Sequence, residues 1–123
     1  MKYVILIYSN PRSRKIWEGF SEAERAEGYR HYAALHEDLA ASGELVVSEA
    51  LADPGQATRV TVRDGRAIPS DGPFAEAKEH LAGLFLVDCP SRERALSWAA
   101  RVPEAVLGLV EVRPVMNLSL PEG

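Results

Sequence analysis

The sequence predicts an α+β fold built from short apolar strands and two helical segments. Along the chain the expected order is strand, helix, strand, hairpin, strand, helix, strand. When the hairpin is set aside, this order is the β-α-β-β-α-β plan of a ferredoxin-like domain. A chain of 123 residues is close to the usual size of one domain. We therefore expect a single ferredoxin-like domain over residues 1–123, with an inserted β-hairpin.

The first strand and the first helix have clear sequence signals. The run "KYVILIY" (residues 2–8) is rich in β-branched and aromatic residues, which favours a strand. A helix is predicted over 21–42, because Ser21 and Glu24 can form a capping box at its start and Gly43 follows its end. Its expected buried stripe consists of Tyr29, Tyr32, Ala33, His36, Leu39 and Ala40.

The middle of the chain is predicted to form two strands separated by a hairpin. "ELVVSEAL" (44–51) and "HLAGLFLVDC" (80–89) are apolar runs of strand length. Between them, "ATRVTVRDGRAI" (57–68) places Asp64 and Gly65 between two strand-like runs. An Asp-Gly pair in this setting favours the tight turn of a β-hairpin.

A second helix and a last strand complete the predicted fold. Ser91 is expected to cap a helix over 92–101, which Pro103 ends. The run "GLVEVRPVMNL" (108–118) is predicted to be the last strand, and Pro114 places it at a sheet edge or beside a bulge. The buried side of the second helix is expected to consist of Ala95, Leu96, Trp98 and Ala99.

The first strand is apolar on both of its faces. Its alternating sets are Val4, Leu6 and Tyr8 on one face and Tyr3, Ile5 and Ile7 on the other. Two helices can cover only one face of a four-stranded sheet, so the second apolar face needs another cover. A second copy of the chain supplies one most simply. We therefore predict a homodimer in which two sheets pack face to face.

Composition argues against several classes of protein. The formal charge of −4 and the absence of a basic cluster predict no nucleic-acid partner. The densest basic stretch, "PRSRK" (11–15), is interpreted as a solvated loop. Cys89 is the only cysteine, so no disulfide can form within the chain. No run approaches the roughly 18 apolar residues of a membrane span, and no leader pattern is present. We expect no membrane association and a cytoplasmic protein.

Several motifs resemble one protein family. The block "DGPFAEAKEHLAGLFLVD" (71–88), with "VRDGR" before it and "WAARVP" and "GLVEVRPV" after it, is similar to the DGPF-domain branch of the YciI-related family. This resemblance implies a dimeric α/β barrel of two ferredoxin-like subunits, with a cleft in each. Members are small bacterial cytoplasmic proteins of generally unassigned activity, often encoded beside or fused to extracytoplasmic-function sigma factors. Relatives with the same barrel include isomerases, oxygenases and heme enzymes, so the fold alone implies no reaction.

The "DGPF" corner has both a structural and a functional interpretation. Turn chemistry accounts for its Asp, Gly and Pro, and Phe74 is expected to be a buried anchor. Turn chemistry does not account for Glu76, Lys78 and Glu79, which precede a strand expected to line the barrel. Acids and a lysine held at a rigid corner beside a cleft can handle protons and bind anions. We therefore predict Asp71 and Glu76 as catalytic residues and Lys78 as a ligand-binding residue.

Two strands carry further candidates. Glu111 and Arg113 lie two residues apart, so they project from the same face of the last strand. They form either a salt bridge or, through Arg113, a carboxylate-binding site. Arg59 and Thr61 share a face of the hairpin. Family members usually carry arginine at the position of Thr61, so Arg59 is predicted to compensate as a ligand-binding residue.

Histidine supplies little evidence of a metal site. His36 lies on the expected apolar stripe, where it serves either as a core residue or as a ligand-binding residue. A His–Asp pair that YciI-like relatives outside this branch carry on this helix falls at Tyr32 and Ala41 here, so that dyad does not transfer. We predict no metal, no heme and no other cofactor.

Two functions remain open at this point. The first is binding of a small polar or carboxylate ligand in the cleft of the dimeric barrel, with acid/base catalysis at the corner. The alternative is a non-catalytic accessory or sensor protein linked to transcription control by extracytoplasmic-function sigma factors. An enzyme needs an enclosed cleft with perturbed acids, whereas an accessory needs an exposed apolar patch that remains after dimerisation.

Overall fold

Four strands form one antiparallel sheet at the centre of the protein. The computed structural model describes residues 1–118. The strands are β1 (Lys2–Ser9), β2 (Leu45–Ala50), β5 (His80–Asp88) and β6 (Val110–Pro114), in the spatial order β2-β5-β1-β6. β1 pairs with both β5 and β6, and β2 pairs with β5, in each case antiparallel. This is the strand order of a ferredoxin-like sheet, as the sequence predicted.

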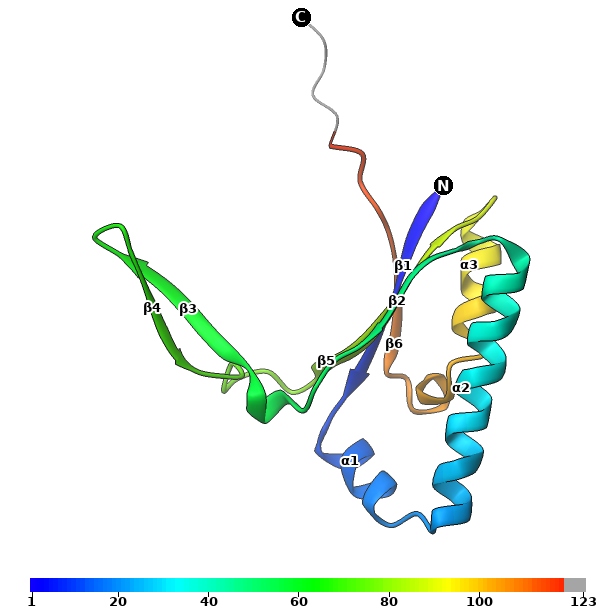
Figure 1. Cartoon of the computed structure of the whole chain (residues 1–123), viewed down its shortest axis with the longest axis horizontal. Coiled ribbons are helices and arrows are strands. Elements are labelled where there is room, and N and C mark those ends of the chain that lie inside the picture. Colours follow the sequence, from blue (N-terminus) through cyan, green and yellow to red (C-terminus); the bar gives the residue numbers. More distant parts are fainter. Residues whose placement is uncertain (119–123) are drawn as a thin grey trace, which may run out of the picture.

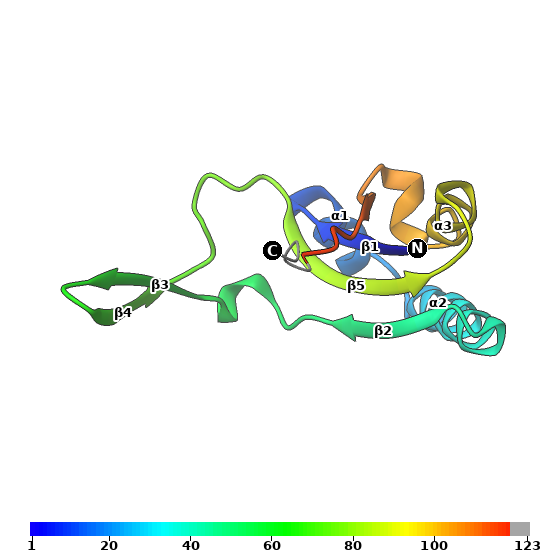
Figure 2. The same ribbon diagram turned by 90° about the horizontal axis from the view of Figure 1, so that it is seen from above.

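The helices lie on one side of this sheet (Figure 1). The long helix α2 (Glu22–Ser42) and the shorter α3 (Arg92–Ala99) run beside each other over the same face. A short helix α1 (Pro11–Glu18) connects the end of β1 to α2. Two 3-10 turns, η1 (Pro54–Gln56) and η2 (Pro103–Leu107), follow β2 and α3. The opposite face of the sheet has no helix over it (Figures 1 and 2).

The core lies between the sheet and the two longer helices. Every second side chain of β1 points toward the helices, because side chains alternate between the faces of a strand. β5 matches this alternation, since Ile5 pairs with Phe85 and Tyr3 pairs with Val87. The buried set comprises Tyr3, Ile5, Ile7, Phe85 and Val87 of the sheet, Leu35 and Leu39 of α2, and Ala95, Trp98 and Ala99 of α3.

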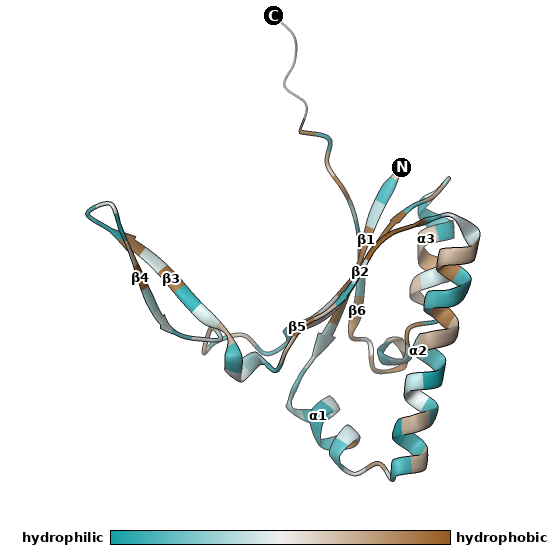
Figure 3. Ribbon diagram, viewed as in Figure 1, coloured by the Kyte–Doolittle hydropathy of each residue, from teal (hydrophilic) through white to brown (hydrophobic). Residues whose placement is uncertain are grey.

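The other alternate side chains of the sheet form an apolar face that no helix of residues 1–118 covers. Val4 lies opposite Leu86, and Leu6 lies opposite Leu84. All four side chains are half-buried by their neighbours in the sheet. The hydropathy colouring shows brown segments along β1 and β5 at this position (Figure 3). We call these four residues the open face of the sheet.

The predicted hairpin forms an arm that stands away from the domain. β3 (Thr58–Arg63) and β4 (Arg66–Asp71) pair only with each other, and every residue in them is exposed. The arm leaves the sheet on the side opposite α2 and α3 (Figures 1 and 2). Positive φ angles at Asp64 and Gly65 confirm the predicted turn. An isolated two-stranded hairpin is marginally stable in water, so this arm needs contacts from beyond its own two strands.

Local signals located most element ends correctly. The Ser21 side chain accepts from the backbone N–H of Glu24, the Glu24 side chain accepts from the backbone N–H of Ser21, and Gly43 ends α2 with φ of 79°. The interpretation of 11–15 as a loop is wrong, because α1 begins there. Asn10 caps α1 by accepting from the backbone N–H of Ser13, so the signal for this helix was present in the sequence.

The predicted buried side of each helix needs correction. In α2 the buried residues are Leu35 and Leu39, whereas His36 is exposed. Figure 3 shows teal and brown bands interleaved along α2, and such a mixed helix has no single apolar stripe for sequence to identify. In α3, Leu96 is 38% exposed although it was expected in the core. The last strand is also shorter than predicted, because β6 ends at Pro114.

The corrected helix orientation makes a prediction about stability. Leu39→Ala should lower the free energy of unfolding by about 2–5 kcal/mol, because a buried leucine loses its packing and leaves a cavity. Leu96→Ala is the matched control on the other helix and should cost about 1 kcal/mol or less. Urea denaturation followed by circular dichroism measures both changes. Equal losses would contradict the assignment of Leu39 to the core and Leu96 to the surface.

Candidate functional site

A hollow lies at one end of the sheet, where the strands meet the helices. Its volume is about 880 Å3, which is within the range of small-molecule sites. α1, α2 and η2 form its walls, and the ends of β1, β2 and β5 form its floor. We call this hollow the helix-side cleft. Residues that line it include Ile7, Arg14, Trp17, Tyr29, Tyr32, Phe85 and Glu104.

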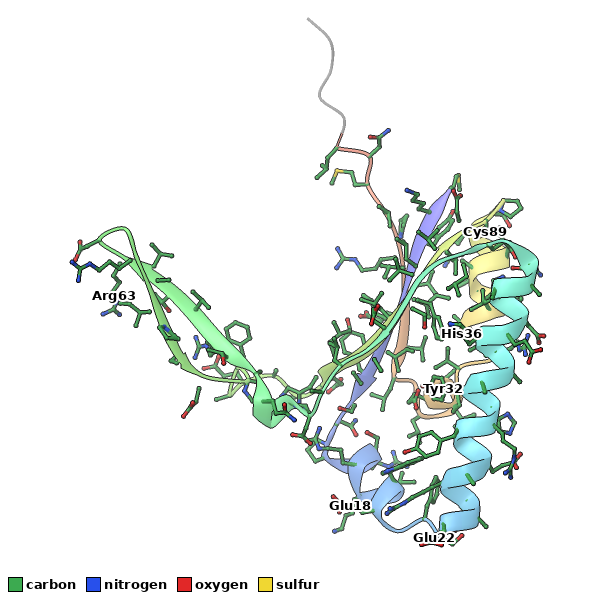
Figure 4. All side chains as sticks on the ribbon, viewed as in Figure 1. Glu18, Glu22, Tyr32, His36, Arg63 and Cys89 are labelled. Carbon is green, nitrogen blue, oxygen red and sulfur yellow. The ribbon has the colours of Figure 1, made fainter. Side chains whose placement is uncertain are left out.

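A tyrosine and an acid meet in the wall of this cleft. The Tyr32 hydroxyl of α2 donates a hydrogen bond to Oε2 of Glu104, in the first turn of η2. Tyr32 projects from α2 toward η2 (Figure 4). Burial raises the pKa of the Glu104 carboxyl, and a backbone hydrogen bond within Glu104 partly opposes this effect. A carboxyl group with a raised pKa in a cleft is suited to giving and taking protons.

Aromatic rings form another wall of the cleft. The Trp17 ring lies edge-on to Phe20 at 5.9 Å and to Tyr29 at 5.4 Å between centroids. Gly28 of α2 lies against this ring, since a Cβ atom there would be 3.4 Å from Cζ3 of Trp17, an ordinary contact distance. The Arg25 guanidinium lies 5.6 Å from the centre of the Trp17 ring and donates to the carbonyl oxygen of Trp17. These contacts hold the indole in place between α1 and α2.

A second, smaller hollow lies at the base of the hairpin arm. Its volume is about 420 Å3, and Leu51, Phe74, His80 and Leu81 are among its lining residues. The Nδ1 atom of His80 is buried and has no hydrogen-bond partner among the described residues. Most of the remaining lining is apolar. The helix-side cleft is therefore lined by more titratable side chains than the smaller hollow.

The predicted corner borders the smaller hollow through Pro73, Phe74 and Glu79, but its proposed proton-handling and anion-binding residues line neither hollow. Asp71 ends β4, and Glu76 and Lys78 follow in the connection to β5; all three side chains are exposed. The expectation that Phe74 is a buried anchor is wrong, since it is 62% exposed. Its ring packs under the Arg59 guanidinium at 4.6 Å, because the arm, rather than the core, is the neighbour of this corner. The functional roles assigned to Asp71, Glu76, Lys78 and Arg59 stay predictions.

The remaining candidates do not line the cleft, although Glu111 contacts Tyr8, which does. Arg113 and Glu111 lie beside the open face, where β1 pairs them with Val4 and Leu6. Both are exposed, and they form no ion pair with each other within residues 1–118. Glu111 raises the pKa of the neighbouring Tyr8, mainly by accepting a hydrogen bond from it, with burial adding to the shift. The ligand-binding roles of Arg113 and of His36, which is exposed on α2, stay predictions.

The Tyr32–Glu104 pair is the feature that sequence reasoning missed. The two residues are 72 positions apart, so no local spacing joins them. Tyr32 carried one signal, because it stands where the resemblance places a histidine. Glu104 carried none, because Pro103 was interpreted only as the end of a helix. The pair exists because η2 turns back toward α2 after the second helix.

Two further properties of residues 1–118 bear on the site. No group of three or more His, Cys, Asp or Glu side chains there is arranged to hold a metal ion. Within the same residues, no helix has the length and apolar character required to cross a membrane.

The fold and the cleft together define a ferredoxin-like α+β domain with a small-molecule-sized hollow between its sheet and helices. The family model for the YCII-related domain matches residues 1–119, and the chain belongs to this family. It is 32% identical over 117 residues to an uncharacterized protein of Rhizobium meliloti, covering 94% of this chain and 92% of that protein. These findings confirm the family that the sequence motifs indicated.

A solved structure shares the fold. It is 5-chloro-2-hydroxyhydroquinone dehydrochlorinase from Burkholderia phenoliruptrix AC1100 in complex with 2,5-dihydroxybenzoquinone. The similarity covers 94% of each chain with a TM-score of 0.51 and 15% sequence identity. At this identity the likeness establishes the arrangement of the elements and no more.

The raised pKa of Glu104 predicts a pH dependence of stability. The folded protein holds this proton more tightly than the unfolded chain, so the contribution is present below the ordinary pKa of 4.5 and is lost as the pH rises through the folded-state value. Glu104→Gln has no such proton and should therefore gain stability relative to wild type as the pH rises. The slope of this difference should be at most about 1.4 kcal/mol per pH unit.

Urea denaturation from about pH 4 to about pH 8 measures the effect, since this range begins near the unfolded-state pKa. Parallel stability curves for the two proteins would contradict the raised pKa.

Proposed function

We propose that the helix-side cleft binds a small polar ligand and that the Tyr32–Glu104 pair exchanges a proton with it. The observation that carries this proposal is the hydrogen bond between the Tyr32 hydroxyl and a partly buried carboxyl group inside the cleft. The proposal retains the small-ligand function that the sequence suggested. It moves the proton-handling group from the exposed corner to the cleft wall.

Removing a carboxylate from water costs free energy. Burial disfavours the ionised form of Glu104, so its carboxyl can donate a proton and then take it back within the cleft. Tyr32 orients that carboxyl through its hydroxyl group and can pass a proton between Glu104 and a ligand oxygen. The structurally similar dehydrochlorinase supports the proposal to the extent that it shows a small-molecule enzyme on this fold. The cleft and its perturbed acid favour this function over the accessory or sensor alternative.

Proton exchange predicts a calorimetric signature. Small carboxylates, phenols and 2,5-dihydroxybenzoquinone would first be screened by NMR for shifts in amides of α1, α2 and η2. Titration calorimetry in buffers of different ionisation enthalpy then counts the protons taken up or released on binding. We expect wild type to exchange protons with the buffer and Glu104→Gln to lose this exchange.

Glu93→Gln is the matched control, because Glu93 is an exposed acid at the start of α3. It should exchange protons as wild type does. Tyr32→Phe should bind with an altered pH profile, since the carboxyl loses its hydroxyl partner. Binding in the cleft with identical proton counts in wild type and Glu104→Gln would refute the proton-handling role.

We also propose that two copies pack through their open faces and form the dimeric barrel. Val4, Leu6, Leu84 and Leu86 are apolar and have no helix over them. The arm extends on the same side, and Val60 and Val62 of β3 are 66% and 67% exposed. Covering both sets of side chains removes apolar surface from water, and an isologous pair satisfies both copies equally.

Light scattering tests the assembly. Wild type should have about twice the chain mass of 13.5 kDa, and Leu86→Asp should shift the population toward monomer, because a carboxylate would be buried at the interface. Leu96→Asp, on the exposed side of α3, should leave the mass unchanged. A stable wild-type monomer at micromolar concentration would refute the dimer.

A further inference from the structure

Arg14 is a half-buried cation in the cleft wall without an anionic partner. Its Nη1 donates to the Ser9 hydroxyl oxygen at 3.3 Å. In contrast, Arg94 and Arg101 form ion pairs with Glu44 and Asp38 at 2.9 and 2.7 Å. Within residues 1–118, Arg14 forms no ion pair. Because a guanidinium carries five donors and remains charged, most of its hydrogen-bonding capacity is available to a ligand.

The charges around Arg14 limit what that ligand can be. Arg14 is the only lysine or arginine among the described residues that line the cleft. Glu18, Glu49 and Asp53 also line it, and all three are exposed. One half-buried cation together with several exposed acids favours a ligand with a single negative charge. Several negative charges would place some of them against these carboxylates.

The aromatic wall limits the shape of the ligand. Tyr29 is 65% exposed although its ring lies against Trp17, so a substantial part of the ring can meet a ligand. Trp17 is held by ring contacts on two sides, and Phe20 lines the same cleft. Aromatic faces and edges pack best against another planar, conjugated ring. A flexible polyol or amino acid would gain little from this wall.

We infer that the ligand of the helix-side cleft is a planar aromatic ring that carries one anionic oxygen group, a carboxylate or a phenolate. Arg14 holds the anionic oxygen through charge-assisted hydrogen bonds, and the ring packs against Trp17 and Tyr29. Further oxygen substituents of the ring are then available to Tyr32 and Glu104. This inference rests on the proposed function and specifies the substrate class of the same site.

The first test compares probes on wild-type protein. Benzoate is the planar anion, cyclohexanecarboxylate has the same charge without a planar ring, benzamide has the ring without the charge, and 4-nitrophenolate replaces the carboxylate by a phenolate. Affinities are measured by titration calorimetry at about pH 8, where the nitrophenol is ionised. We expect benzoate or 4-nitrophenolate to bind at least about tenfold more tightly than cyclohexanecarboxylate and benzamide. The tighter of the two anions identifies the oxygen group.

The second test uses variants of α1. Arg14→Gln should weaken binding of the preferred aromatic anion by at least about tenfold, whereas Arg12→Gln, at an exposed arginine of the same helix, should leave it unchanged. Arg14→Lys retains the charge but not the planar fork and should fall between them. Circular dichroism establishes that each variant is folded. If Arg14→Gln does not fold, the lysine variant and the wild-type probe comparison decide the outcome.

The outcomes separate this inference from the function on which it rests. Equal affinity for benzoate and cyclohexanecarboxylate would refute the inference that the ligand is an aromatic anion. Unchanged binding in folded Arg14→Gln would refute it as well. Neither result contradicts proton exchange through Glu104. If only non-aromatic ligands bind and Glu104→Gln abolishes their proton exchange, the aromatic-anion inference is refuted and the proposed function is supported. Failure of every probe to shift amides around the cleft overturns both proposals.

Discussion

The pairing of β1 with β5 at the centre of the sheet positions most of the structure. Because side chains alternate along a strand, this pairing directs Ile5 and Phe85 into the helix-covered core and directs Leu6 and Leu84 to the opposite face. The core fixes α2 and α3 over one face of the sheet. The cleft then lies where the sheet ends and these helices meet α1 and η2. A one-residue slip of register would exchange the two faces and remove both the core and the floor of the cleft.

The cleft brings together groups whose local sequences have little in common. Tyr32 comes from the middle of a long helix, Glu104 from a 3-10 turn and Arg14 from a short helix after the first strand. Asn10 caps α1, and Trp17 of α1 packs against Tyr29 of α2. The proton exchange and anion binding that we propose for the cleft therefore depend on the same helix packing as stability does. The open face and the arm lie on the side of the sheet opposite α2 and α3, and Leu84 of the open face also lines the cleft.

The "DGPF" corner has a structural role at the base of the arm. The N–H of Gly72 donates to the carbonyl oxygen of Ala57 at 2.8 Å, and a Cβ atom at Gly72 would lie only 2.9 Å from that oxygen. Glycine is therefore required by close approach of the backbone and not by a positive φ angle. Together with the packing of Phe74 under Arg59, this contact closes the hairpin at its base.

The sequence alone determined the family, the order of the strands with α2 and α3, the caps of α2 and the turn of the hairpin, but it missed α1. Each of these depends on residues near one another in the chain, such as Ser21 with Glu24 or Asp64 with Gly65. It did not determine which side of α2 is buried, that Phe74 is exposed, or that Tyr32 meets Glu104. The tertiary structure decided these, because burial and a raised pKa arise from the packing of elements distant in sequence, and local spacing carries no record of that packing.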